Sequence, residues 1–269
     1  MKNLFTPELK EIALGILSEV ADFCEKNDIR YYLVCGTALG AVRHNGFIPW
    51  DDDIDIGMPR PDYERFAQMY HSEAFPLYTN QRDKKYPYTF GKVCDSKTIL
   101  IEKNIQKPYP MGVYIDIFPM DGLPDDPQKR KKHLSRVDWH LRVLSWKRIS
   151  TQKKIGSIHK IIQCIAKLVL APIPISTLIR RFEKSLKRYD YESGKYVGHL
   201  VTRSYWGKTE KPREIFEPYY KHPFEDCEFR VPRDYHQYLT LEYGSYMELP
   251  PKEKQVTHHG FDAYWKSET

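Results

Sequence analysis

Apolar residues in the first part of the chain recur with helical spacing and then change to the spacing of strands. Over residues 6–26 they return every three or four positions, and Pro7 stands where the first turn of a helix tolerates proline. We therefore expect a helix over 6–26, with Thr6 as its N-cap. A short buried strand is expected over 31–35, then a tight turn at Gly36 and Thr37, and one or two helical turns over 38–43.

The next stretch alternates strictly between polar and apolar residues. Residues 53–58 read Asp-Ile-Asp-Ile-Gly-Met, which is the period of a strand with one polar face and one core face. A helix is expected over 61–71, and strands over 88–94, 98–102 and 113–118, the last one stopped by Pro119. Residues 1–125 are thus expected to form a mixed α/β unit.

The rest of the chain divides into two parts. Residues 126–190 have a helical pattern that is broken by Pro172 and Pro174, and residues 191–269 alternate short apolar runs with proline-rich loops. We expect a helical segment followed by a C-terminal portion that closes over the N-terminal unit.

Composition describes an ordinary globular protein. The chain has 269 residues, of which 41% are hydrophobic and 29% charged, which excludes disorder, collagen and coiled coil as descriptions of the whole. Its five cysteines form no C-x-x-C pair, so neither a disulfide framework nor a zinc knuckle is indicated. The N-terminus lacks the apolar region of a secretory signal, and we expect a cytoplasmic protein.

Positive charge is concentrated in one segment. Residues 129–188 hold 17 Lys and Arg against two acids, which leaves 25 basic and 34 acidic residues elsewhere. Within it, residues 155–170 form an amphipathic helical pattern, preceded by Lys147, Arg148, Lys153 and Lys154. Such a helix either lies on anionic lipid at the inner face of the cell membrane or packs against the domain with a solvated basic rim. Lys167, together with the prolines beyond it, excludes a transmembrane span.

The most informative motif is an acidic run on the first alternating strand. Side chains at i and i+2 share a face of a strand, so Asp51, Asp53 and Asp55 are expected to project together. Several carboxylates on one face repel each other unless a cation lies among them. Oxygen ligands suit Mg2+ or Mn2+, which leave positions open for phosphates. The alternative is an acidic turn.

A turn before this strand and an acidic residue after it extend the candidate site. Gly36 and Thr37 precede a short helix, where free backbone N–H groups favour phosphate. Asp116 is a lone acid within the apolar run 113–118, where it is either a third metal carboxylate or a salt-bridged core residue. A Gly-Thr turn, two strand carboxylates and a third on a neighbouring strand describe a nucleotidyltransferase-like fold.

Longer motifs resemble one family. Residues 35–44 (CGTALGAVRH) and 46–57 (GFIPWDDDIDIG) look like the signature of the LicD family, the bacterial phosphocholine transferases related to fukutin and fukutin-related protein. Residues 92–95, 114–119 with Asp121 and Gly122, and 243–251 are also similar to that family. The resemblance covers nearly the whole chain, and the cationic segment is its least distinctive part.

The resemblance implies a reaction and a set of roles. The family transfers a phospho-alcohol, typically phosphocholine from CDP-choline, to a hydroxyl of a cell-surface glycan or a lipid-linked teichoic acid precursor, and CMP leaves. By resemblance Asp53 and Asp55 bind the metal, Asp51 supports or joins them, and Asp116 is the third carboxylate. A metal-bound diphosphate and a carboxylate that accepts the hydroxyl proton fit this chemistry.

Basic residues inside or near the motifs are candidate substrate ligands. Arg43, His44 and Lys92 are candidates for binding the donor phosphates, and His258 and His259 could reach a phosphate or the acceptor. Each of these is otherwise an ordinary surface charge. The abundant tyrosines, 20 in all, agree with a choline ligand but select no particular cage.

Other functions stay open at this stage. The transferred group could be phosphoribitol, phosphoethanolamine or a nucleotidyl group. A different class is a membrane or polyanion binding protein whose acidic cluster holds a structural cation. No known nucleic-acid motif accompanies the basic segment, so no nucleic-acid partner is expected.

Overall fold

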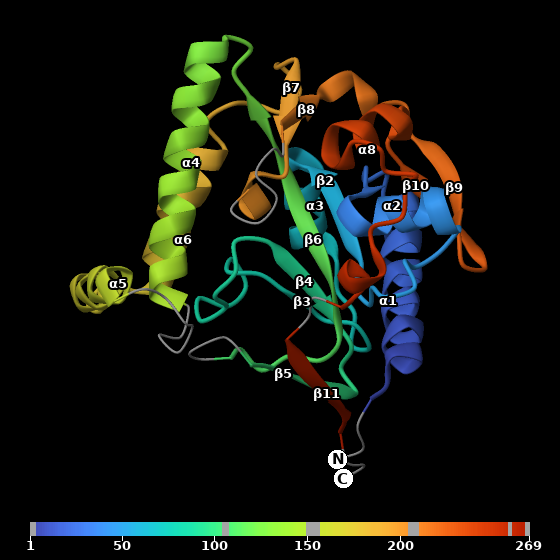
Figure 1. The fold of residues 1–269 in the computed structure, drawn as a ribbon, viewed down its shortest axis with the longest axis horizontal. Helices are drawn as coiled ribbons and strands as arrows, with labels where there is room; N and C mark the ends of the chain where they lie inside the picture. The colour runs from blue at the N-terminus through green and yellow to red at the C-terminus, as the bar shows by residue number, and fades with distance from the viewer. Residues whose placement is uncertain (1–3, 104–107, 149–156, 204–209, 258–259, 267–269) are drawn as a thin grey trace.

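A mixed β-sheet forms the centre of the protein, and helices from both halves of the chain lie against it (Figure 1). The computed structural model describes residues 4–103, 108–148, 157–203, 210–257 and 260–266. The strand order is β1-β2-β6-β4-β3, with β7 beside β6 and β8 beside β7. Strands β2 and β6 are parallel, and the other pairs in this sheet are antiparallel. The expected mixed α/β class is confirmed.

The strands come from distant parts of the chain. The central sheet consists of β1 (Tyr32–Leu33), β2 (Asp55–Pro59), β3 (Leu77–Tyr78), β4 (Gly91–Cys94), β6 (Tyr114–Leu123), β7 (Tyr196–Gly198) and β8 (Glu210–Pro212). Outside it, β5 (Thr98–Glu102) pairs with β11 (Phe261–Trp265), and β9 (Tyr220–Phe224) pairs with β10 (Cys227–Val231). Strand β11 thus brings the end of the chain back to the N-terminal half.

The helices largely follow the expected ranges. They are α1 (Thr6–Lys26), α2 (Cys35–His44), α3 (Arg60–Met69), α4 (Pro127–Arg148), α5 (Ser157–Leu170), α6 (Ile175–Leu186) and α8 (Tyr235–Tyr243). The N-cap of α1 is Phe5 instead of Thr6, and the backbone N–H of Phe5 donates to the Glu8 carboxylate at 3.0 Å. Pro172 and Pro174 separate α5 from α6, as expected. Among the described helices, none has both the length and the apolar composition needed to cross a membrane.

Strand β6 runs past Pro119, and the prediction that this proline ends the strand is wrong. The N–H of Asp116 donates toward β2, so alternation directs the nitrogen of residue 119 to the opposite edge. On that edge, β4 pairs only as far as Ile117 and β7 begins to pair at Asp121. Because Pro119 lies in the gap between these two neighbours, its missing N–H costs no ladder hydrogen bond.

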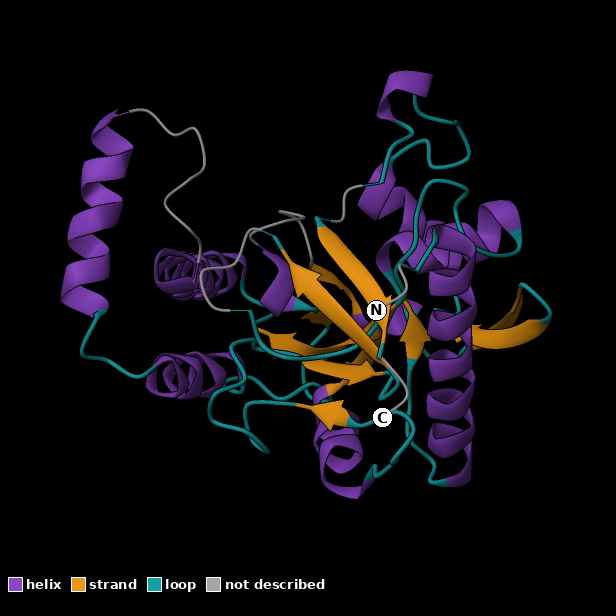
Figure 2. Cartoon of the chain, turned by 90° about the horizontal axis from the view of Figure 1, so that it is seen from below, coloured by secondary structure: helices purple, strands orange, loops and turns teal. Residues whose placement is uncertain are grey.

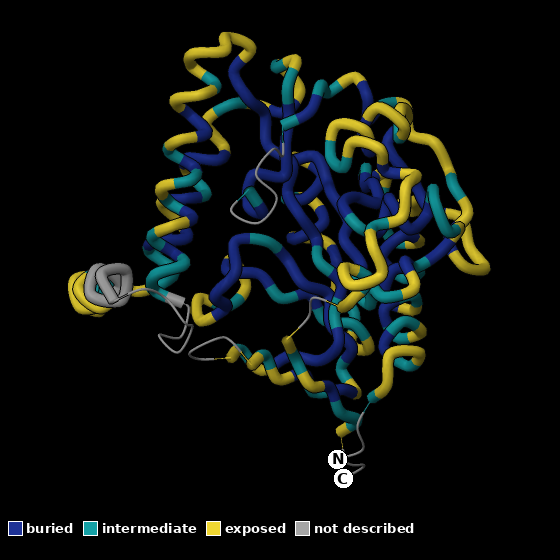
Figure 3. Tube along the Cα trace, viewed as in Figure 1, coloured by how far each residue is buried: buried dark blue, intermediate teal, exposed yellow. Residues whose placement is uncertain are grey.

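One continuous core joins the N-terminal and C-terminal parts. Helix α1 contacts β6 and buries Ile16, Leu17 and Val20 completely, and the same core includes Phe216 and Leu239. Figure 3 shows β2 and β6 buried along most of their length. Residues 191–269 therefore share their packing with the first part of the chain.

The junction of β1 and α2 is a sharp elbow. The expected strand is cut short because Cys35 takes φ 51° and α2 begins there. This left-handed conformation is unfavourable for a residue with a Cβ. The Cys35 N–H donates to the hydroxyl of Tyr238 in α8 at 3.0 Å, and both residues are buried. A C-terminal helix thus fixes the elbow on which the candidate site depends.

Replacing Tyr238 by Phe should lower the free energy of unfolding by about 1–3 kcal/mol, because the buried Cys35 N–H loses its partner. Tyr32→Phe is the matched control. The Tyr32 hydroxyl is also buried but has no hydrogen-bond partner within the described residues, so its removal should be neutral or stabilising. Urea unfolding of both variants checks this. Equal destabilisation by both would contradict the proposed support of the elbow.

Candidate active site

Three charged residues form a row across neighbouring strands of the sheet. Asp55 of β2 is the register partner of Asp116 in β6, and Asp116 is the register partner of Lys92 in β4. Figure 1 shows these three strands side by side. Register partners project from the same face of a sheet, so the three side chains meet there. Ile115 and Ile117, one position away, are fully buried on the opposite face, as the alternation predicted.

The Asp55 carboxylate lies in a strongly unfavourable environment for a negative charge. Asp55 is only 6% exposed. Burial raises its pKa well above the usual range, and repulsion from Asp53, Asp116 and Asp51 raises it further, while Lys92 opposes this effect. The acidic run and Asp116 therefore act on one another electrostatically, as the sequence suggested.

Lys92 is an internal partner of Asp116. Its Nζ lies 2.5 Å from Asp116 Oδ1, and its side chain is 3% exposed. The ammonium also lies 3.3 Å from the ring centroid of Tyr114 and 5.0 and 5.2 Å from those of Tyr88 and Phe90. Three aromatic faces and one carboxylate thus hold this cation in place. The sequence predicts Lys92 as a phosphate ligand, and this stays a prediction; in the structure its ammonium group pairs with Asp116 and neutralises that carboxylate.

The first turn of α2 adjoins the carboxylates. A Cβ added to Gly36 would come within 2.8 Å of Asp51 Oδ2, so the absence of a side chain there lets Asp51 lie against the helix N-terminus. The Thr37 hydroxyl accepts a hydrogen bond from the Asp55 N–H at 2.8 Å and keeps its own proton to donate. Gly36 and Thr37 therefore connect the elbow to Asp51 and to the first residue of β2.

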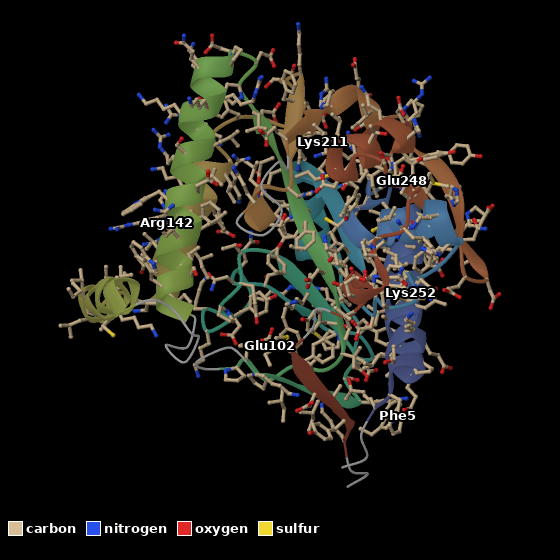
Figure 4. The ribbon with its side chains drawn as sticks, viewed as in Figure 1. Phe5, Glu102, Arg142, Lys211, Glu248 and Lys252 are labelled. Atoms are coloured by element: carbon tan, nitrogen blue, oxygen red, sulfur yellow. The ribbon has the colours of Figure 1, made fainter. Side chains whose placement is uncertain are left out.

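Arg43 and His44, at the other end of α2, contact the C-terminal segment. Arg43 donates to the carbonyls of Tyr246 and Glu248 at 2.8 and 3.3 Å, and to His44 Nε2 at 3.0 Å. Figure 4 labels Glu248 on this segment. Burial, together with the charge of Arg43, lowers the pKa of His44. These contacts hold residues 243–251 against α2.

Residues near the C-terminus also meet the acidic run. The hydroxyl of Thr257 donates to Asp52 Oδ1 at 3.4 Å. His258 and His259, which follow Thr257 and were expected to bind substrate, lie outside the described residues. The expected strand over 53–58 begins at Asp55 instead of Asp53, so Asp51 and Asp53 lie in the segment just before β2. Ile54, the last residue of this segment, accepts a hydrogen bond from the Asp116 N–H at 2.9 Å.

Two residues behind the elbow could not be identified from the sequence. The Cys35 Sγ lies 3.9 Å from His199 Nε2. Burial is the main cause that lowers the pKa of His199 to about 3, and the nearby positive charge of Lys211 is the second. Lys211, labelled in Figure 4, is itself buried in an ion pair with Glu242 at 2.6 Å. No motif or spacing distinguishes these residues. Two of the rings around Lys92 could have been identified from the sequence. Tyr88 and Phe90 precede Lys92 at i, i+2 spacing on an expected strand, which places all three on one face.

The carboxylates form no preassembled cage. Among the described side chains, no group of three or more His, Cys, Asp or Glu residues is placed to hold a metal ion. The chemistry of the set nevertheless fits a hard cation. The four aspartates offer only oxygen ligands, and Asp53, Asp116 and Asp51 raise the pKa of Asp55 by repulsion, which a bound cation would offset.

Known proteins resemble this chain both in one conserved domain and over nearly its whole length. The LicD/FKTN/FKRP nucleotidyltransferase domain matches residues 28–146, which include the whole row and α2. The lipopolysaccharide cholinephosphotransferase LicD of Haemophilus influenzae is 35% identical over 98% of this chain and 99% of its own length. The human ribitol 5-phosphate transferase FKRP is 40% identical over 55 residues, which are 20% of this chain and 11% of that protein. With this near-complete match, the chain belongs to the LicD/FKTN/FKRP nucleotidyltransferase family.

Proposed function

We propose that this protein transfers phosphocholine from CDP-choline to a hydroxyl of a cell-surface glycan and releases CMP. The observation that carries the proposal is the row Asp55–Asp116–Lys92, in which Asp55 and Lys92 are buried and Asp116 is partly exposed. Asp55 adjoins the first turn of α2 through the hydroxyl of Thr37. The near full-length similarity to a lipopolysaccharide cholinephosphotransferase supports phosphocholine as the transferred group and a lipopolysaccharide glycan as acceptor. A teichoic acid precursor is the other acceptor consistent with the family.

We further propose that the site uses Mg2+ or Mn2+. Asp53, Asp55 and Asp116 would hold the ion, with Asp51 beside them. Asp51 lies against the N-terminus of α2, where its carboxylate would repel a donor phosphate at Gly36 and Thr37. A bound cation would neutralise the diphosphate and the departing CMP.

We assign the proton transfer in this reaction to the side chains of the row. The acceptor hydroxyl oxygen attacks the phosphorus that carries choline, the bond from this phosphorus to the CMP oxygen breaks, and the hydroxyl proton passes to a carboxylate. Asp116 is the candidate base, because Lys92 fixes its position from within the protein. Lys92 would act through Asp116, with which it forms an ion pair, as a positioning residue.

A second candidate donor comes from the similarity to FKRP, which is named a ribitol 5-phosphate transferase. The matched region is short, and the full-length relative carries choline in its name. We therefore rank phosphocholine first, ahead of phosphoribitol, phosphoethanolamine and nucleotidyl transfer.

A donor panel tests the proposed function. The protein is incubated with Mg2+, a lipopolysaccharide core oligosaccharide or a teichoic acid precursor, and CDP-choline, CDP-ribitol, CDP-ethanolamine or CTP in turn. We expect CMP release with kcat/KM for CDP-choline at least about tenfold above the other donors, the discrimination that one well-matched pocket supplies. Faster release of CMP from CDP-ribitol would replace choline by ribitol. Pyrophosphate release from CTP would indicate nucleotidyl transfer, and no turnover of any donor would favour a binding protein.

Substitution in the acidic run tests the metal proposal. Asp53→Asn and Asp55→Asn should each abolish turnover, because each removes a proposed ligand. Without metal, neither variant should be less stable than the wild type, since carboxylate repulsion is relieved. Mg2+ should raise the Tm of the wild type and leave the Tm of both variants unchanged.

Asp52→Asn is the matched control in the same run. Its side chain accepts from Thr257, which an amide oxygen can also do. This variant should keep its activity within about threefold of the wild type, an effect of under 1 kcal/mol. Full activity in the Asp53 and Asp55 variants, or equal loss in the Asp52 variant, would contradict the proposed ligand set.

A further inference from the structure

Helices α4, α5 and α6 form the edge of the molecule that lies farthest from α1. Helix α4 contacts both α5 and α6, and Figures 1 and 2 show α5 roughly perpendicular to the other two and beyond them at the outer edge of the molecule. Figure 3 shows most of the described part of α5 exposed. This edge contains the segment in which the sequence concentrates positive charge.

Large apolar side chains are exposed on α5 and on the adjoining face of α4. Leu168, Val169 and Ile165 are 77%, 65% and 57% exposed, and Trp139 of α4 is 55% exposed. Trp139, Ile165 and Val169 line an apolar hollow of about 370 Å³ between the two helices, together with Trp146. Single exposed apolar residues are ordinary, but a contiguous group on two packed helices indicates an interaction surface.

A cationic groove lies between α4 and α6. It has a volume of about 800 Å³, and Glu183 is the one carboxylate among its described lining residues. Its basic lining residues are Arg136, Arg180, Arg181, Lys184, Lys187 and Arg188. Lys187 pairs with Glu64 at 2.5 Å, whereas no described carboxylate forms an ion pair with the other five. The groove therefore offers several guanidinium and ammonium groups to an anion.

Lys147, which the sequence places among the basic residues that could face lipid, instead binds backbone carbonyls inside the protein. Its Nζ donates to the carbonyls of Leu170, Ala171 and Ile173 at 2.5, 3.2 and 2.6 Å, at the C-terminal end of α5. A lysine here satisfies carbonyls that a helix end leaves without partners. Lys147 fixes α5 to α4, so a charge-reversal test belongs on the groove and not on this residue.

We propose that the exposed apolar face of α4 and α5, together with the cationic groove of α4 and α6, docks on a bilayer that contains anionic lipids. On such a bilayer, the apolar side chains would insert at the acyl boundary and the Lys and Arg side chains would bind the phosphate headgroups. A second copy of the chain would bring a like-charged segment against this one and be repelled. Membrane docking would hold the active site near a lipid-linked acceptor, and in this respect the inference rests on the proposed function.

Co-sedimentation with vesicles tests the docking surface. Wild-type protein should bind vesicles of phosphatidylglycerol and phosphatidylcholine, bind pure phosphatidylcholine at least about tenfold more weakly, and dissociate as NaCl rises to about 0.5 M. The double variant R180E/K184E should bind anionic vesicles at least about 20-fold more weakly, because each basic residue near such a surface contributes about fivefold. Leu168→Ser should weaken binding by about tenfold through lost apolar burial.

The matched control is K26E/R233E, which changes the net charge equally. Both residues are exposed, and they belong to α1 and to the segment just before α8, away from the α4–α6 edge. This control should bind anionic vesicles within about threefold of the wild type, because distant charges are screened. Circular dichroism and thermal melting should show all variants folded, since the replaced side chains are exposed.

Absence of wild-type binding to anionic vesicles, or equal loss in the control variant, would overturn the proposal. Binding of inorganic phosphate in the groove without vesicle binding would also overturn it, in favour of a site for a free anion. The variants should release CMP at the wild-type rate with a water-soluble acceptor. An inactive wild type that still binds vesicles would therefore contradict the proposed function alone.

Discussion

The register of β6 between its two neighbours is the constraint on which the site depends. Parallel pairing with β2 places Asp116 beside Asp55, and antiparallel pairing with β4 places Lys92 on its other side. A slip of one residue in either pair would turn a charged side chain into the core and an isoleucine out of it. The fully buried Ile115 and Ile117 therefore lock the register that brings the charges together.

The C-terminal portion stabilises this arrangement from the other side. Tyr238 holds the Cys35 N–H at the elbow before α2, and Arg43 at the far end of α2 holds the carbonyls of Tyr246 and Glu248. Helix α2 is therefore fixed at both ends by residues some 200 positions away in sequence. This explains how Gly36 and Thr37 keep their place beside Asp51 and Asp55, although β1 contributes only two residues to the sheet.

The sequence was sufficient to predict what depends on local pattern. Alternation predicted that Asp55 and Asp116 lie on strands with isoleucines opposite, and helical periodicity predicted α1. Pairing between distant strands could not be predicted this way. The ion pair of Lys92 with Asp116 was therefore not predicted, because Asp116 is 24 positions away and on a different strand. The prediction that Pro119 ends the strand was wrong for the same reason. Whether β6 can contain a proline there depends on where its neighbours β4 and β7 end and begin.

The central claim is that Asp116 and Lys92 act as one unit, and a double-mutant cycle on single-turnover CMP release tests it most directly. Asp116→Asn and Lys92→Met are measured alone and together, with the affinity for CDP-choline measured in parallel and folding checked by circular dichroism. Each single variant should slow the chemical step by about 100-fold or more, the scale of lost acid–base help. The double variant should be no slower than the slower single variant, because residues that act as a unit are not additive. Multiplicative losses, or an unchanged rate in Asp116→Asn, would contradict the account.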